Sequence, residues 1–136
     1  MENLTEPQVW AMFGTMSIAF ALRSIGALLG LWLALRIAAN IRASEEDNML
    51  AKVLGSIFGV LMVMGAAYWQ VAYMAYRADV ANGLKAMDAT LSAGGQRFAD
   101  RFASADPVTT PGALLIVYDP TVLLIILGSI WMKKKA

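Results

Sequence analysis

The chain has 136 residues and a formal net charge of +1, with 59% hydrophobic and 15% charged residues. Soluble domains are about 45–50% apolar and about 25% charged, so this composition excludes an ordinary soluble domain and a disordered chain. The near-zero charge argues against nucleic-acid binding, and the lack of Cys and His excludes disulfides, thiolate or imidazole metal sites and Ser-His-Asp catalysis. We therefore predict a single all-α integral membrane domain that is not an enzyme and has no cofactor.

The first predicted helix covers residues 7–42. Its apolar stretch, Val9–Leu35, contains one charged residue, Arg23, and is long enough to cross a bilayer. Thr5 and Gln8 suit the cap and third position of a helix start. No Lys or Arg precedes the stretch, so we interpret it as a retained anchor and not as a signal peptide.

The second predicted helix covers residues 48–91 and crosses the membrane at about 53–76. Beyond the membrane its apolar residues recur at spacings of three and four, which indicates one face of a helix. This face is formed by Val80, Leu84, Met87 and Leu91. It can fold back on the protein, lie on lipid or dock on another subunit. Because so small a chain has little surface of its own to cover the stripe, we predict that these four residues dock on a partner.

The segment 77–111 connects the second and third spans. The pair Gly94 and Gly95 is expected to end the preceding helix, and a short helix is predicted at 96–103. The segment carries four positive and four negative residues. This balance does not favour attraction to anionic lipid.

The third predicted span covers residues 112–133 and contains Asp119 followed by Pro120. Either proline kinks one continuous helix, or Asp119 caps a helix that begins at Pro120. We favour the kinked helix, because a helix beginning at Pro120 would be too short for a full span. The fold class is then three transmembrane helices, the second of them extended outside the membrane.

Arg23 and Asp119 are the two charged residues within apolar spans. An ionisable residue at this depth costs several kcal/mol unless it is paired or hydrated. We predict an intramembrane ion pair between them, whereas a proton or ion relay is the alternative. Two small-xxx-small patterns in the first two spans predict close helix packing in this helical hairpin. They are formed by Gly26, Gly30, Gly55 and Gly59.

The functional expectation follows by elimination. We expect a non-catalytic accessory subunit that stabilises a larger multi-subunit complex of the bacterial inner membrane by helix packing. The candidate hosts are respiratory complexes, photosynthetic complexes, and membrane oxidases or monooxygenases. The expected partners are the lipid bilayer and the other membrane subunits of a hetero-oligomer. The distribution of Lys and Arg favours an outer N-terminus and a cytoplasmic C-terminus. The alternative is a homo-oligomeric ion or proton channel, or a small transporter, that uses Arg23 and Asp119.

Overall fold

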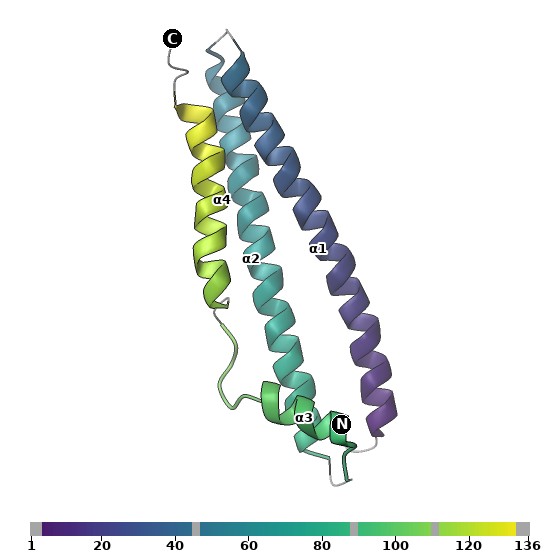
Figure 1. Cartoon of the computed structure of the whole chain (residues 1–136). Helices are drawn as coiled ribbons and strands as arrows, with labels where there is room; N and C mark the ends of the chain where they lie inside the picture. Colours follow the sequence, from purple (N-terminus) through teal and green to yellow (C-terminus); the bar gives the residue numbers. More distant parts are fainter. Residues whose placement is uncertain (1–3, 45–46, 88–89, 110–111, 133–136) are drawn as a thin grey trace. The chain divides into compact units, whose positions relative to one another are not determined.

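The computed structural model describes residues 4–44, 47–87, 90–109 and 112–132, apart from the side chains of 113–115. Within these ranges it contains helices and no strand (Figure 1). The helices are α1 (Glu6–Ala43), α2 (Met49–Lys85), α3 (Ala93–Phe102) and α4 (Ala113–Trp131). The predicted all-α fold class is thus confirmed.

Local capping explains where the first two helices begin. The backbone N–H of Thr5 donates to the side-chain carbonyl of Gln8 at 2.8 Å, as the capping pattern predicted. The α2 helix begins one residue after Asn48, whose side-chain oxygen accepts from the N–H of Ala51 at 3.0 Å. The first turn of α2 contains no acidic residue.

The boundary between α2 and α3 differs from the prediction. The α2 helix ends at Lys85 and not at Leu91, and Gly94 and Gly95 lie in the first turn of α3 instead of ending a helix. The Ser92 hydroxyl caps α3 by accepting from the N–H of Gly95 at 3.1 Å. The chain therefore turns after Lys85. As a result, Met87 and Leu91 pack against the core that contains Leu84 of α2.

The described helices group into two compact units, and α1 and α2 each contribute to both. The α3 unit consists of Met1–Leu22 and Trp69–Pro111. The three-helix unit consists of Arg23–Tyr68 and Gly112–Ala136. Each unit has its own hydrophobic core.

The core of the three-helix unit joins α1, α2 and α4. It contains small residues of α1, Ala34 and Ala38, which are 1% and 0% exposed and let the neighbouring helices approach closely. Its other buried members are Leu31, Val63, Ile126 and Ile130. At one end, the indole N–H of Trp131 donates to the Ser56 hydroxyl at 2.9 Å.

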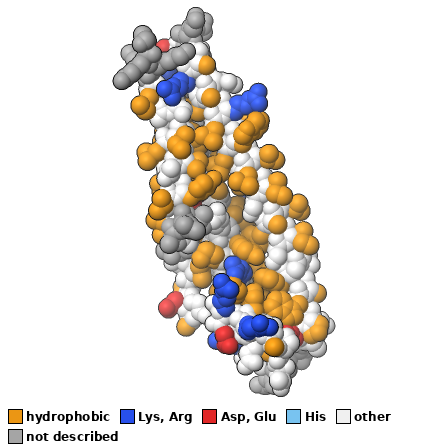
Figure 2. Space-filling model, viewed as in Figure 1, with side chains coloured by type: hydrophobic (Ala, Val, Ile, Leu, Met, Phe, Trp, Pro, Cys, Tyr) orange, Lys and Arg blue, Asp and Glu red, His pale blue; other side chains and the backbone are white. Residues whose placement is uncertain are grey.

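The α1 and α2 helices are long and apolar enough to cross a membrane, by length and composition alone. Both contain an 18-residue window of mean hydropathy 1.9, of which only 11% in α1 and 22% in α2 is buried by the chain itself. Figure 2 shows these apolar side chains on the outer surface of the helices. The apolar part of α4 described here, Ile116–Trp131, is shorter, so a third span is not confirmed.

The α4 helix runs through Pro120 without interruption. The alternative in which Asp119 caps a new helix is therefore wrong, and one continuous helix is found. Proline has no N–H, so the carbonyl of Ile116 loses its helical hydrogen bond. This leaves an unsatisfied backbone acceptor one turn before Pro120.

Candidate functional site

Asp119 is the one charged residue that the described part of the chain buries, with 8% of its surface exposed. It lies on the face of α4 that also carries Val122, Leu123 and Ile126, which pack in the core of the three-helix unit. Among the described residues Asp119 makes no hydrogen bond and no ion pair. The carboxyl group thus lies beside apolar neighbours and near the unsatisfied carbonyl that Pro120 creates.

The packing register indicates what lies opposite this carboxyl group. A Cβ on Gly55 would lie 3.4 Å from Ile130, and a Cβ on Gly59 would lie 2.6 Å from Ile126. These two contacts define an antiparallel register of α2 and α4. Two turns further, the same register places Asp119 opposite Ala66, which is itself buried. The small alanine side chain leaves the carboxyl group without a polar neighbour on α2.

Arg23 lies on α1 with an exposed side chain. The described part of the chain contains no ion pair between Arg23 and Asp119. The predicted pairing within one chain is therefore not formed here. The separate possibility that each residue meets a group from another chain stays a prediction.

Three of the four predicted packing glycines are in close contacts. Met62 occupies the space where a Cβ on Gly30 would lie, and Gly55 and Gly59 face isoleucines of α1 and α4. Gly26 is different, because a Cβ there would meet nothing within 4 Å. The contacts of these glycines are with large side chains and not with the other glycine pattern: Gly30 meets Met62, and Gly55 and Gly59 meet isoleucines.

The predicted docking stripe is covered by the chain itself. Leu84 is completely buried in a core with Val9 of α1 and Ala99 of α3. The other three residues of the stripe, Val80, Met87 and Leu91, are partly buried against the same core. The expectation that another subunit must cover this stripe is therefore wrong, because the turn after Lys85 lets α3 fold over it.

A carboxylate links the start of α1 to the start of α3. The side chain of Glu6 accepts from the backbone N–H of Ser92 at 2.8 Å and from its hydroxyl at 2.6 Å. It also accepts from the indole N–H of Trp10 at 2.9 Å. These hydrogen bonds, those from Ser92 first, lower the pKa of Glu6 below its ordinary value. A side chain at Gly95 would meet this carboxylate and would force the Glu6 side chain to move.

An aromatic cluster fills the rest of the α3 unit, and the sequence did not reveal it. Phe13 of α1 contacts Trp10, Tyr76 and Phe98, with ring centroids 5.1–5.9 Å apart. Phe20 continues the cluster to three aromatic residues of α2. Trp69, Tyr73 and Tyr76 therefore hold α1 against α2.

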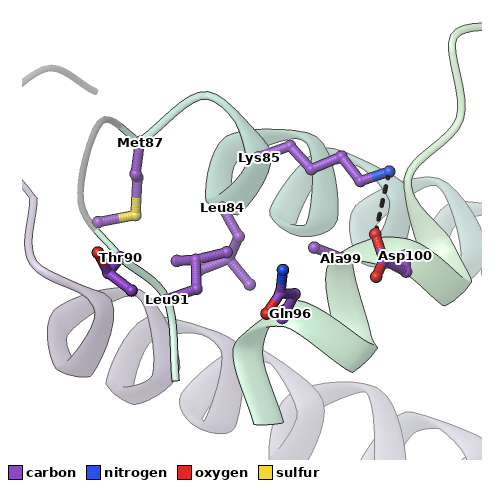
Figure 3. Close-up of a pocket in the computed structure, with 8 residues that line it drawn as sticks. All are labelled: Leu84, Lys85, Met87, Thr90, Leu91, Gln96, Ala99 and Asp100. Atoms are coloured by element: carbon purple, nitrogen blue, oxygen red, sulfur yellow. Dashed lines mark ion pairs between the residues drawn. The ribbon is translucent and has the colours of Figure 1, made fainter. Parts of the chain in front are cut away.

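A pocket of about 300 Å³ opens beside this core. It lies between the end of α2, the following turn and α3, and the Lys85 ammonium and the Asp100 carboxylate approach to 3.6 Å at its edge (Figure 3). The remaining polar lining comes from Thr90 and Gln96. Within the described ranges, no three His, Cys, Asp or Glu side chains gather to hold a metal ion. The pocket thus offers an ion pair and two neutral polar groups around an apolar floor.

Acidification should weaken the α3 unit through Glu6. Because the pKa of Glu6 is lowered in the folded state, its contribution to stability is present above the ordinary value of 4.5 and is lost as the pH falls through the lowered value. Hydrogen exchange of the α3 amides should accelerate in that pH range. Glu6→Gln should remove this pH dependence, whereas Asp79→Asn, which removes an exposed carboxylate of α2, should preserve it. An unchanged pH profile in Glu6→Gln would contradict the assignment.

The predicted site residues thus fall into separate places: a buried acid on α4, an exposed base on α1, packing glycines and a self-covered stripe. A comparison with family models, curated proteins and solved structures found no match.

Proposed function

We propose that the protein is a non-catalytic accessory subunit of a larger complex in the bacterial inner membrane. It would stabilise that complex, of a respiratory, photosynthetic or membrane oxidase or monooxygenase type, by helix packing. The observation that supports this most is the small buried share of the apolar windows of α1 and α2. Apolar surface of this extent is stable only against lipid or against other helices.

One face of α1 favours other helices as its neighbours. Arg23 and Gly26, three positions apart, are both exposed there, and the space beside Gly26 is open. Exposing arginine to lipid at the centre of a span costs about 2.5–3.5 kcal/mol on insertion scales. Glycine and serine are enriched where transmembrane helices contact each other. A partner helix against this face would shield the exposed arginine from lipid.

We further propose that α4 is a third span. A helix of 19 residues is about 28 Å long, close to the ~30 Å of a hydrocarbon core. The N-terminus and residues 77–111 are then outside and the C-terminus is cytoplasmic, as the distribution of Lys and Arg favours. Cysteines at Ser92 and Ala136, probed with an impermeant thiol reagent on intact cells, test this orientation; labelling at 136 but not at 92 would reverse it.

The subunit proposal predicts a specific effect of Gly26→Leu. Since a side chain at Gly26 meets nothing within the chain, the variant should fold normally and yet exclude a helix from this face. Gentle detergent extraction, size analysis and mass spectrometry should find other chains in stoichiometric amounts with the wild type and lose them with Gly26→Leu. Gly14→Leu adds the same side chain at another open position of α1 and serves as the matched control.

The homo-oligomeric channel or transporter is the second candidate, and the buried Asp119 favours it. A carboxyl group within an apolar helix is typical of ion and proton pathways. The same measurement separates the two functions, because a homogeneous ring of this chain would support the channel. Retention of all partner chains by Gly26→Leu would remove the main support for the subunit proposal.

A further inference from the structure

Two arginines share one aromatic ring in the α3 unit. The guanidinium carbon of Arg77, on α2, lies 3.7 Å from the ring centroid of Phe102, and that of Arg101, on α3, lies 5.4 Å from the same centroid. Arg77 also lies 5.6 Å from the ring of Tyr73. Helices α2 and α3 thus bring together two cations that are far apart in the sequence.

This arrangement leaves the hydrogen-bond donors of both arginines available. A guanidinium that stacks on a ring uses its face, while its N–H groups lie in its plane and point away from the ring. Neither arginine forms an ion pair with a carboxylate in the described part of the chain. The two guanidinium carbons lie 3.7 and 5.4 Å from one centroid and are therefore at most about 9.1 Å apart, so an anion beside Phe102 would be attracted by both cations.

Some of the charged groups near α3 are already engaged within the chain. Lys85 is paired with Asp100, and the Glu6 carboxylate is used by Ser92 and Trp10. Figure 2 shows Lys and Arg side chains gathered on the face that carries α3. The segment as a whole stays balanced, with three arginines and three aspartates besides the pair of Lys85 and Asp100, so any attraction to an anionic headgroup is local to the arginines around Phe102.

The position of the arginines along α2 fits a membrane surface. Tyr73 lies one helical turn before Arg77, and Trp69 one turn before Tyr73, at the end of an apolar segment. Tyrosine and tryptophan concentrate at the level of lipid headgroups. A basic side chain one turn further from the hydrocarbon lies where phosphate groups are found.

We propose that Arg77 and Arg101, both within cation–π distance of Phe102, bind the phosphate of an anionic lipid headgroup. Arginine suits this ligand because its planar pair of donors matches two phosphate oxygens. The site requires that α2 crosses the membrane, but it requires no partner subunit. It is therefore independent of the packing face at Gly26.

The test measures lipid affinity of the full chain in neutral detergent, by native mass spectrometry. Dioleoyl-phosphatidylglycerol should bind more tightly than dioleoyl-phosphatidylcholine. Each arginine removed should weaken binding of phosphatidylglycerol roughly fivefold, so Arg77→Gln with Arg101→Gln should weaken it about 25-fold. Added salt should weaken binding to the wild type, because it screens the attraction.

Two further variants separate binding from folding. Arg77→Lys with Arg101→Lys keeps both charges and should keep the preference for phosphatidylglycerol. Arg36→Gln with Arg42→Gln removes the same charge from the three-helix unit and should leave the affinity unchanged; Arg36 also lies over an aromatic ring, at 5.3 Å from Trp32. Hydrogen exchange of the α3 amides checks that α3 stays docked in every variant.

Three outcomes would overturn the proposal. The glutamine pair could bind phosphatidylglycerol as tightly as the wild type while α3 stays docked. The control pair could lose as much affinity as the glutamine pair, which would indicate a general charge effect. Soluble glycerol phosphate could bind to the wild type as tightly as the lipid, which would assign the site to a free phosphate ligand.

Discussion

Leu84→Asp should unfold the α3 unit while leaving the three-helix unit intact. Leu84 is completely buried between α1 and α3, and removing its side chain alone costs about 2–5 kcal/mol. The aspartate adds a buried carboxylate without a partner, which costs several kcal/mol more. The total approaches the whole stability of a small unit. Hydrogen exchange should show loss of protection throughout α3 and at the end of α2.

Ala86→Asp is the matched control, because it introduces the same side chain at an exposed position just after α2 ends. It should leave the protection of α3 unchanged. If Leu84→Asp leaves α3 as protected as in the wild type, the described core does not hold this unit together. If Leu84→Asp unfolds the α3 unit and also releases partner chains, the release is due to the loss of the whole unit and not to the loss of a docking stripe.

Asp119→Leu should stabilise the isolated chain in detergent. The carboxyl group is buried, lacks a partner among the described residues and lies opposite Ala66. A buried polar group without a hydrogen bond costs about 1–3 kcal/mol, and an apolar side chain of similar size removes that cost. Thermal unfolding should shift upward by several degrees. Thr121→Leu, which removes an exposed hydroxyl two residues later, should give a much smaller change.

A double-substitution cycle with Arg23→Leu completes this test. In the isolated chain the two substitutions should be additive within about 0.5 kcal/mol, because the described chain forms no ion pair between them. In the assembled complex a larger coupling would show that the two residues act together there. A strong coupling in the isolated chain would restore the ion pair that the sequence predicted.

The features predicted correctly are those encoded by neighbouring residues. Thr5 and Gln8 are three positions apart, so their capping interaction is readable from the sequence. The long helices follow from apolar composition, which is also a local property. The path of α4 through Pro120 could be favoured because the shorter alternative would not reach across a bilayer.

The features that were missed depend on contacts between distant residues. The spacing of apolar residues at three and four positions continues to Leu91, and no residue near Lys85 indicates that the helix ends there. The turn is favourable because Leu84 then meets Val9, and because Ser92 meets Glu6 across 86 positions. The aromatic cluster has the same origin, since Phe13 and Phe98 come from opposite parts of the chain.

The link between Glu6 and Ser92 has a consequence for how the protein is made. Glu6 and Ser92 are 86 residues apart in the sequence, so they leave the ribosome at different times. At about 5–20 residues per second, the start of α1 waits on the order of 4–17 s before α3 exists. During this interval the apolar side chains at the start of α1, such as Val9 and Phe13, have no cover from α3. Insertion factors or chaperones that shield this segment therefore have a defined period in which to act, and it ends when α3 has been synthesised and folds over the segment.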